Sequence, residues 1–469
     1  MHKRDRKPIL YRIVSIAFRF WVKVFFKKID VRHGHNIPAA GPVVFVANHP
    51  NSIMDGFVIR GLFKRKVNFI AHIGLFQQPF MGWVMRRTGN IPVYRRSDFP
   101  EKMDQNVKMF SECTATLEKG ETIFIFPEGV SDILRKVKKI KTGAARIILE
   151  AEEKNNFELG VQVVPIGLHF YSRSRFHSRV LVNVGAPLQL GPFFEKYRAE
   201  SFEAVRLLTD EIQKRLEELT VNVENEELDA LTRDIESIYR DDLKSVFKGD
   251  GKSKSKSYRE EFFISKTVAD CVQHLYEENP ERLTQLQQDI RSYKRKLKHL
   301  KLHDSMLKDT ASQRDIWMQI IRTYLTAMLG FLPALYGIVN HYIPYRIANY
   351  FARHFAYERT KILTALFIGG GLAFNIFYLI QTAAVSALWG FRWGLVYFIT
   401  LPLFGFYALS FVENIREQKE NISFSIYLLT NKHVLNRMRR QRRLLIQLLD
   451  SIRDDYLQKR PLDTIFKKT

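Results

Sequence analysis

The pattern of hydrophobic and polar positions between about residues 40 and 195 is that of short strands alternating with helices. Runs rich in Val, Ile and Phe favour extended structure and predict strands over 43–47, 67–71, 91–94, 122–126, 162–168 and 179–184. Apolar positions at helical spacing between these runs predict helices that include 53–63, 103–118 and 133–150. This alternation predicts an α/β fold, with a mixed, mainly parallel sheet flanked by helices, in a domain of residues 31–200.

The first segment, residues 1–30, contains a predicted helix over 9–28 that is basic and amphipathic. Most of its residues are Ile, Val, Phe or Trp, and its cations form one narrow stripe, which consists of Arg12, Arg19, Lys23 and Lys27. Such a helix is typical of the membrane interface, where its cations face lipid phosphates. An ordinary core helix is the alternative interpretation. No small-residue cleavage site follows, so we do not expect a secretory signal.

The chain after the α/β domain is predicted to be helical. Residues 201–315 form a charged helical region, in which "KGDGKSKSKS" at 248–257 predicts an exposed flexible loop. A membrane region of residues 316–412 follows, and a basic helical tail of residues 413–469 ends the chain.

The membrane region contains three uncharged runs. Two of them, 362–391 and 393–412, are long enough to cross a bilayer and predict a two-helix hairpin over 362–412. The positive-inside rule places the basic segment 346–361 and the basic tail in the cytoplasm. We therefore expect the first run, 323–345, to be re-entrant and to turn at Pro333, with the α/β domain on the cytoplasmic face.

The composition points to an anionic partner. The 469 residues include 73 Lys and Arg against 49 Asp and Glu, which gives a formal charge of +24. Such an excess fits nucleic acid, an anionic membrane leaflet or a phosphorylated substrate. Abundant Phe and Tyr beside long uncharged runs favour the membrane, and without a nucleic-acid-binding motif we expect no nucleic acid partner. Two cysteines, Cys113 and Cys271, exclude a disulfide framework.

The first candidate for chemistry is "NHPNSIMD", which follows the predicted strand 43–47. A neutral imidazole at His49 can take a proton from an attacking hydroxyl, and a carboxylate at Asp55 can fix its tautomer. The simpler interpretation is a turn in which Ser52 caps the next helix. Asn51 and Ser52 lie in the same turn and are further candidate site residues.

Three further segments carry candidate residues. In "TGNIPVYRRSD", Arg95 and Arg96 end a short strand and suit bidentate phosphate binding. In "TIFIFPEGVSD", a buried strand stops at a proline before Glu128 and Gly129, and a basic stretch that includes Lys141 follows. The fourth segment, "QVVPIGLHF", is a buried strand that contains Pro165. A surface salt bridge or a solvated turn is the simpler interpretation of each segment taken singly.

In this order and spacing, the four segments resemble the four motifs of the glycerolipid acyltransferase family, which includes the lysophosphatidate and glycerol-3-phosphate acyltransferases. The resemblance covers about residues 40 to 190. It implies that His49 is the general base, that Asp55 orients it, and that the acceptor is bound by Arg95, Glu128 and Gly129. Pro165 matches the proline of the fourth motif.

One departure from the family pattern concerns the first motif. The commoner spacing has four residues between the histidine and the aspartate, and this chain has five. The longer spacing occurs among yeast-type glycerol-3-phosphate and dihydroxyacetone-phosphate acyltransferases. An extra residue turns a helical side chain by about 100°, so the loop must absorb that rotation.

The resemblance implies an integral membrane O-acyltransferase of phospholipid synthesis. It would move a fatty acyl chain from acyl-CoA or acyl carrier protein to a hydroxyl of glycerol-3-phosphate or dihydroxyacetone phosphate, without a metal or another cofactor. The alternative within the family acylates 1-acylglycerol-3-phosphate to give phosphatidate. The alternative from another class is a non-catalytic membrane scaffold, which a buried His49 directed away from any pocket would favour.

Overall fold

The computed structural model describes residues 8–132, 134–173, 175–247, 256–300, 302–307, 313–355, 361–430 and 432–459. They form two compact units, of which the first is mainly Met1–Glu224 and the second is mainly Asn225–Phe355 and Ala365–Leu462. Most of the loop expected at 248–257 lies outside the described residues, and its last two residues begin a helix.

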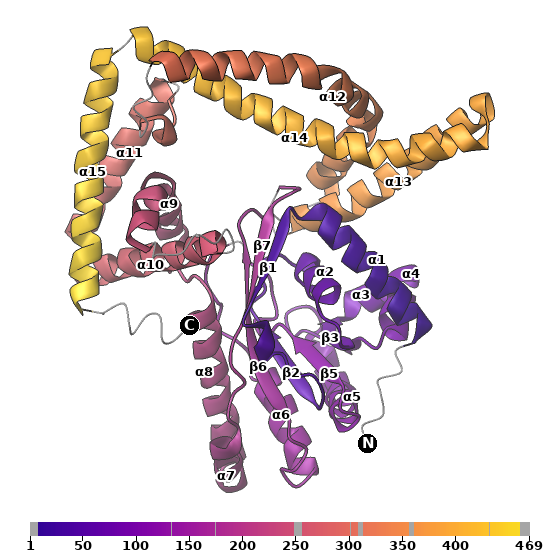
Figure 1. The fold of residues 1–469 in the computed structure, drawn as a ribbon. Helices are drawn as coiled ribbons and strands as arrows, with labels where there is room; N and C mark the ends of the chain where they lie inside the picture. The colour runs from indigo at the N-terminus through magenta and orange to yellow at the C-terminus, as the bar shows by residue number, and fades with distance from the viewer. Residues whose placement is uncertain are drawn as a thin grey trace. The chain divides into compact units, whose positions relative to one another are not determined.

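The first unit is built on a seven-stranded sheet with the order β1-β7-β6-β2-β5-β3-β4 (Figure 1). Its strands are β1 (Lys28–Arg32), β2 (Val43–Ala47), β3 (Val67–His72), β4 (Ile91–Val93), β5 (Thr122–Ile125), β6 (Gln162–Phe170) and β7 (Arg179–Val184). All six predicted strands are present, with ends within two residues of the prediction. β1 was not predicted, because the helical pattern before it was extended through residue 28 and the strand is mostly half-buried.

The sheet is mixed and mainly parallel, as predicted. β7 runs antiparallel to β6, and every other neighbouring pair is parallel. The carboxyl ends of β6, β2, β5, β3 and β4 therefore lie along one edge of the sheet in that order. Sites in open α/β sheets form at this edge.

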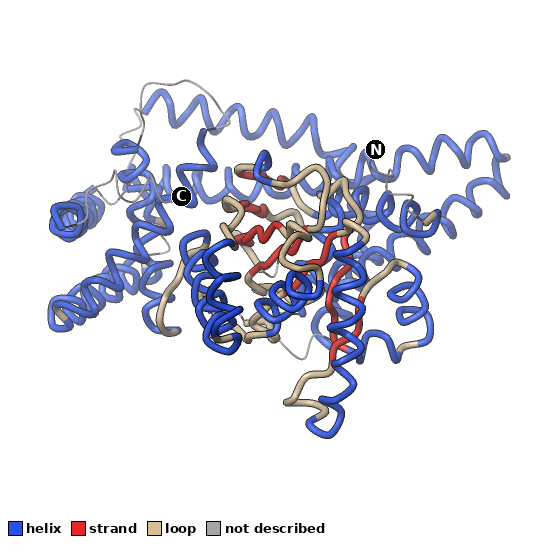
Figure 2. Tube along the Cα trace, turned by 90° about the horizontal axis from the view of Figure 1, so that it is seen from below, coloured by secondary structure: helices blue, strands red, loops and turns tan. Residues whose placement is uncertain are grey.

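Helices pack on both faces of this sheet (Figure 2). They are α1 (Ile9–Phe25), α2 (Ile53–Leu62), α3 (Ile73–Gln77), α4 (Pro79–Arg87), α5 (Asn106–Glu118), α6 (Gly143–Lys154), α7 (Gly191–Ala199) and α8 (Ser201–Leu219). On one face, α5, α6 and α8 bury a continuous aliphatic core that includes Leu117, Ile148 and Leu208. On the other face, Phe45 of β2 contacts Phe63 at the end of α2.

The helix predicted over 133–150 is wrong in its first half, because α6 begins only at Gly143. Before it, three backbone N–H groups donate to side chains outside the segment, two of which are more than 70 residues away in the sequence. Those of Val137, Lys138 and Ile140 bind the side-chain oxygens of Asn222, Glu128 and Gln213. Donors used in this way are not available for helical hydrogen bonds, so the segment follows an irregular path beside the sheet edge.

The second unit is entirely helical in the described residues. It contains α9 (Glu226–Phe247), α10 (Lys256–Glu278), α11 (Pro280–His299), α12 (Gln313–Phe355), α13 (Ile362–Trp389), α14 (Phe391–Thr430) and α15 (Lys432–Lys459). Three segments are long and apolar enough to cross a membrane: Ile321–His354, Ile362–Trp389 and Phe391–Arg416.

The turn expected at Pro333 is wrong, because α12 continues through both Pro333 and Pro344. A proline removes one helical hydrogen bond, and packing against neighbouring helices can offset that loss. Here α14 supplies the packing. A Cβ atom at Gly337 would lie 2.2 Å from the carbonyl oxygen of Phe404, so the two backbones approach closely. Small residues at such a contact are typical of membrane helix pairs.

Candidate active site

The site begins where β2 ends, in the middle of the sheet edge. Asn48 follows β2 and makes a two-way bridge to the neighbouring strand β6. Its amide group donates to the carbonyl oxygen of Leu168 at 3.1 Å, and its side-chain oxygen accepts from the Leu168 N–H at 2.7 Å. The bridge fixes the backbone immediately before His49.

His49 and Asp55 are in direct contact, as the resemblance implies. The distance from His49 Nδ1 to Asp55 Oδ2 is 2.8 Å, and the same oxygen accepts the backbone N–H of Asn51 at 2.9 Å. The Asp55 side chain is fully buried, whereas that of His49 remains 13% exposed. The aspartate is thus inside the protein and the histidine is at its surface.

The extra residue of the first motif is absorbed at Ser52. Its φ of 52° and ψ of −136° are rare for a residue with a Cβ atom. The backbone N–H of Met54 donates to the carbonyl oxygen of Asn51, so these residues make a tight turn. Ser52 makes no capping hydrogen bond to α2, which contradicts the simple helix-cap interpretation. The strained turn brings Asp55, in the first turn of α2, back to His49.

The protonation of the pair follows from this geometry. A carboxylate accepts, so His49 Nδ1 carries the hydrogen in the neutral ring, and Nε2 has a lone pair. Burial raises the pKa of Asp55, while the hydrogen bonds from His49 and Asn51 and the charge of Arg173 oppose the rise. The imidazole also stacks on Phe126, with ring centroids 4.1 Å apart. His49 is therefore held as a base whose free nitrogen is oriented.

Glu128 supports the turn from the next strand. One oxygen accepts the backbone N–H of His49 at 2.8 Å, and the other accepts that of Lys138 at 3.2 Å. Burial raises the pKa of this carboxyl, and the two N–H groups oppose the rise. Both carboxylate oxygens accept backbone N–H groups, so Glu128 connects the turn at His49 to the irregular segment at Lys138. Gly129 has a φ of 72°, and a Cβ atom there would lie 2.9 Å from Lys141 Nζ.

Arg95 follows β4, at the far end of the same edge. Three strand spacings separate β2 from β4 in the sheet order, or roughly 14 Å at 4.7–4.9 Å per spacing. Arg95 is partly buried and Arg96 is exposed. Between the two ends lies His72 at the end of β3, with its Nε2 2.9 Å from Asp98 Oδ2. His72 was not among the predicted site residues, although its position at the end of a predicted strand places it at this edge.

The side chains of three further predicted residues, Asn51, Pro165 and Lys141, make no hydrogen bond with the His49–Asp55 pair among the described residues. The Asn51 side chain is fully buried and makes no hydrogen bond among the described residues. Pro165 lies inside β6, where its missing N–H falls just before the antiparallel ladder with β7 begins at Ile166. Lys141 is exposed. The structure thus brings together His49, Asp55 and Glu128, and it places Arg95 and Arg96 farther along the edge.

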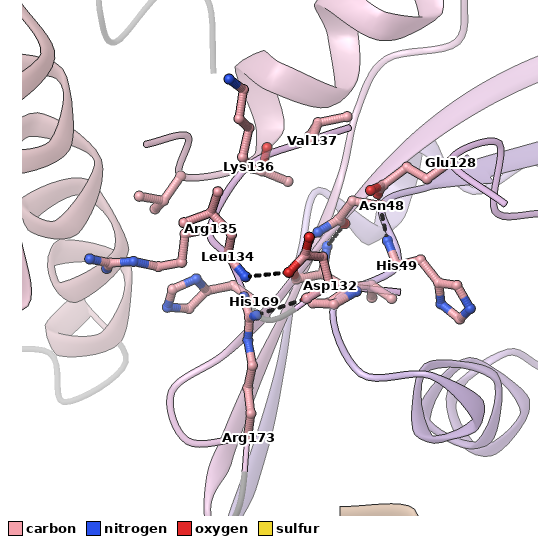
Figure 3. A pocket seen from close by; sticks show the side chains of 14 residues that line it. Asn48, His49, Glu128, Asp132, Leu134, Arg135, Lys136, Val137, His169 and Arg173 are labelled. Carbon is pink, nitrogen blue, oxygen red and sulfur yellow. Dashed lines mark hydrogen bonds between the residues drawn. The ribbon is translucent and has the colours of Figure 1, made fainter. Parts of the chain in front are cut away.

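A pocket adjoins the His49 turn (Figure 3). The basic residues that line this pocket were not predicted as site residues; they come from the irregular segment after β5 and from the end of β6. They are Arg135, Lys136, His169 and Arg173. The basic character of the first segment was visible in the sequence, but its helical interpretation gave no reason to place it at the site. In the described part of the chain, no cluster of three or more His, Cys, Asp or Glu side chains could hold a metal ion.

Comparison with known proteins gives matches of consistent kind. The family model named Acyltransferase matches residues 28–169. A chloroplastic 1-acyl-sn-glycerol-3-phosphate acyltransferase from Arabidopsis thaliana is 32% identical over 144 residues, which cover 30% of this chain and 36% of the relative. Glycerol-3-phosphate O-acyltransferase 1 from Saccharomyces cerevisiae is 23% identical over 320 residues, which cover 50% of this chain and 42% of the relative.

A solved structure is also similar. The 1-acyl-sn-glycerophosphate acyltransferase from Thermotoga maritima shares 24% identity, with a TM-score of 0.34, over 46% of this chain and 83% of that protein. The chain spans less than half of the length of the two curated relatives described above. Residues 28–169, which carry the His49–Asp55 pair, thus form an acyltransferase domain similar to those of glycerolipid acyltransferases.

Proposed function

We propose that the protein transfers a fatty acyl chain from an acyl thioester to a hydroxyl of glycerol-3-phosphate or dihydroxyacetone phosphate. The observation that carries this proposal is the 2.8 Å contact between His49 Nδ1 and the buried Asp55, at the strand edge where such sites form. The contact orients a base without any nucleophilic side chain being needed, because the acceptor itself supplies the hydroxyl.

The proposed reaction uses the tautomer of His49 that the hydrogen bond to Asp55 selects. His49 Nε2 removes the hydroxyl proton as the acceptor oxygen attacks the thioester carbonyl, and Asp55 stabilises the imidazolium that forms. The tetrahedral oxyanion then collapses, the carbon–sulfur bond breaks, and the imidazolium returns its proton to the leaving thiolate. Each atom and charge is accounted for by the two substrates and this pair, so we propose that no metal or other cofactor takes part.

The acceptor requires a cation for its phosphate. Arg95 is our candidate, because a guanidinium binds phosphate in bidentate fashion and because it lies on the same edge as His49. Lys141, beside Gly129, and Arg96 are further candidates. The three apolar helices fit an acyl chain that enters from lipid, with the catalytic domain on the cytoplasmic face, where both substrates occur, and the basic residues toward an anionic leaflet.

A second acceptor is favoured by the names of the relatives. The plant relatives are named for 1-acyl-sn-glycerol-3-phosphate, and the yeast relatives for glycerol-3-phosphate. An assay of the purified protein with one acyl-CoA and three acceptors separates these proposals. We expect the highest kcat/KM with glycerol-3-phosphate or dihydroxyacetone phosphate. A clear preference for 1-acylglycerol-3-phosphate would instead support phosphatidate synthesis.

The scaffold alternative makes a different prediction in the same assay. A protein that only kept the fold would give no product with any acceptor. The partial exposure of the His49 side chain favours an enzyme. Absence of product from all three acceptors, with both acyl-CoA and acyl carrier protein as donors, would favour the scaffold.

A further inference from the structure

The pocket beside the His49 turn has more positive than negative charge. Arg135, Lys136 and Arg173 line it, together with His169 and the two carboxylates of Glu128 and Asp132. Both carboxylates are engaged by other groups. Glu128 accepts two backbone N–H groups, and Asp132 contacts Lys138 Nζ at 2.7 Å and the Leu134 N–H at 3.0 Å.

Arg173 ties the pocket to the catalytic pair. Its guanidinium donates to the carbonyl oxygen of Asp132 at 3.0 Å, so it spans from the end of β6 to the loop after β5. Its charge also acts to lower the pKa of Asp55. The pocket is thus adjacent to the proposed reaction centre. Its cations come from two loops, and the hydrogen bond from Arg173 to Asp132 connects these loops.

The pocket and the imidazole of His49 lie on different sides of the Asn48–Pro50 turn. Figure 3 shows Arg135, His169 and Arg173 on one side of this turn, while the His49 ring points to the other side. An acceptor with a short glycerol backbone must hold its phosphate close to the reacting hydroxyl. A phosphate in this pocket is therefore better suited to a substrate whose phosphate and reacting carbon are joined by a long arm.

Thioester donors have this chemistry. Coenzyme A and acyl carrier protein both carry the acyl chain on a long pantetheine arm that ends in a phosphate. We propose, on the basis of the acyl transfer proposed above, that the pocket of Arg135, Lys136 and Arg173 binds the phosphate-bearing end of the thioester donor. The cationic lining of the pocket suits a phosphate and not an acyl chain.

Two measurements on the full-length protein test this proposal, with Lys136→Gln and Arg173→Gln as variants. Lys136 is exposed, so its substitution leaves packing intact even if the Arg173 variant folds poorly. Lys139→Gln is the matched control, because Lys139 is exposed on the same segment and does not line the pocket. The first measurement is the Kd of free coenzyme A by equilibrium dialysis. The second is KM for palmitoyl-CoA, palmitoyl-pantetheine without the phosphate, palmitoyl-acyl carrier protein and the acceptor.

Loss of a hydrogen bond to a charged group costs roughly 1.5–3 kcal/mol, or about 10- to 150-fold. We expect each pocket variant to raise the Kd of coenzyme A and the KM of palmitoyl-CoA by at least about 10-fold. Lys139→Gln should leave both constants unchanged. With palmitoyl-pantetheine, the variants and the wild type should have the same KM. An equal increase with acyl carrier protein would assign the pocket to the phosphopantetheine phosphate, and an increase with palmitoyl-CoA alone to the nucleotide phosphates.

Two results would overturn the inference. One is a change in KM for the acceptor with none for palmitoyl-CoA, which would assign the pocket to the acceptor phosphate. The other is an unchanged Kd of coenzyme A in both pocket variants. The binding measurement needs no turnover, so a protein that binds coenzyme A through this pocket but transfers no acyl group would refute the proposed function and leave the pocket assignment standing.

Discussion

At the scale of single residues, the contact between His49 and Asp55 depends on the backbone of Ser52. A non-glycine residue at such a φ costs roughly 1–3 kcal/mol. We therefore predict that Ser52→Gly raises the free energy of unfolding by about 1 kcal/mol, because the Ser52 side chain makes no capping bond whose loss would offset the gain. Thermal unfolding measures this effect, and Ser97→Gly, at an exposed position with negative φ, is the control. Destabilisation by Ser52→Gly would show that the serine side chain, and not the backbone, shapes the turn.

The burial of Asp55 has a consequence for pH. Its folded pKa is raised, so the cost of burying the carboxylate is absent below the unfolded pKa, near 4, and grows as the pH rises toward the folded pKa. An amide does not titrate. We therefore predict that Asp55→Asn gains stability relative to the wild type as the pH is raised from acid toward neutral, and that it lowers kcat by up to about 10⁴-fold. Unfolding midpoints measured for both proteins between pH 4 and 8 test this, and a pH-independent difference would contradict it.

Some of this site was predictable from its residues. The histidine and aspartate could be paired because they flank one strand–helix turn. The role of Glu128 could not, since its partners are two backbone N–H groups, one of them 79 residues away at His49. Arg173 shows the same limit. Its place beside the pair is set by the alignment of β6 with β2, which no local pattern contains.

At the scale of elements, the strands and helices were predicted correctly where burial of apolar side chains alone determines the local structure. The strands that consist of uninterrupted Val, Ile and Phe were predicted correctly. These residues favour extended structure, and a run without polar residues must be buried. The irregular segment before α6 was predicted as helix because its apolar spacing is helical. Its N–H groups instead bind Asn222 and Gln213, which are far away in the sequence.

Packing of α15 in the second unit rests on Arg442. This buried side chain donates to Asp304 at 3.1 Å, to Asp242 at 2.6 Å and to the carbonyl oxygen of Ile238 at 3.0 Å. Removing one partner from a buried ion pair costs roughly 3–5 kcal/mol, because the remaining charges stay buried. We predict that Arg442→Met lowers the stability of the second unit by about this amount and makes α15 sensitive to protease.

Arg443 provides the matched control, because it follows Arg442 on α15 and is exposed. Arg443→Met should leave the thermal midpoint and the protease pattern unchanged. Equal behaviour of the two variants would show that the ion pairs of Arg442 do not hold α15 in place.

At the scale of the whole molecule, the contacts of α15 restrict the membrane topology. α15 packs on α10 and α11, so in a protein that is inserted in a membrane, as we propose, the helices before and after the apolar segments lie on the same side of that membrane. The chain must then cross an even number of times between residues 307 and 432. Three segments are long enough to cross, so at most two of them do so. The predicted hairpin of α13 and α14 satisfies this condition if α12 does not cross.

Accessibility of single cysteines tests this topology in a variant in which serines replace Cys113 and Cys271, which are both buried. With an impermeant maleimide on intact cells, we expect a cysteine at position 392 to react. Cysteines at positions 298, 354 and 459 should react only after lysis. Reaction of 459 but not 298 from outside would require an odd number of crossings and would contradict the packing of α15. Reaction of 298 from outside would place the charged helices on the non-cytoplasmic face.

The central claim is that His49 is the general base of an acyl transfer. Its most direct test is the rate at which purified protein acylates glycerol-3-phosphate from palmitoyl-CoA, measured for the wild type, His49→Ala and His35→Ala. His35 is an exposed histidine outside the site, and its variant should keep the wild-type rate. General-base catalysis contributes roughly 10²- to 10⁴-fold, so we predict that His49→Ala loses activity by at least about 100-fold while its unfolding midpoint stays near that of the wild type. A folded His49→Ala protein that turns over at the wild-type rate would contradict the claim.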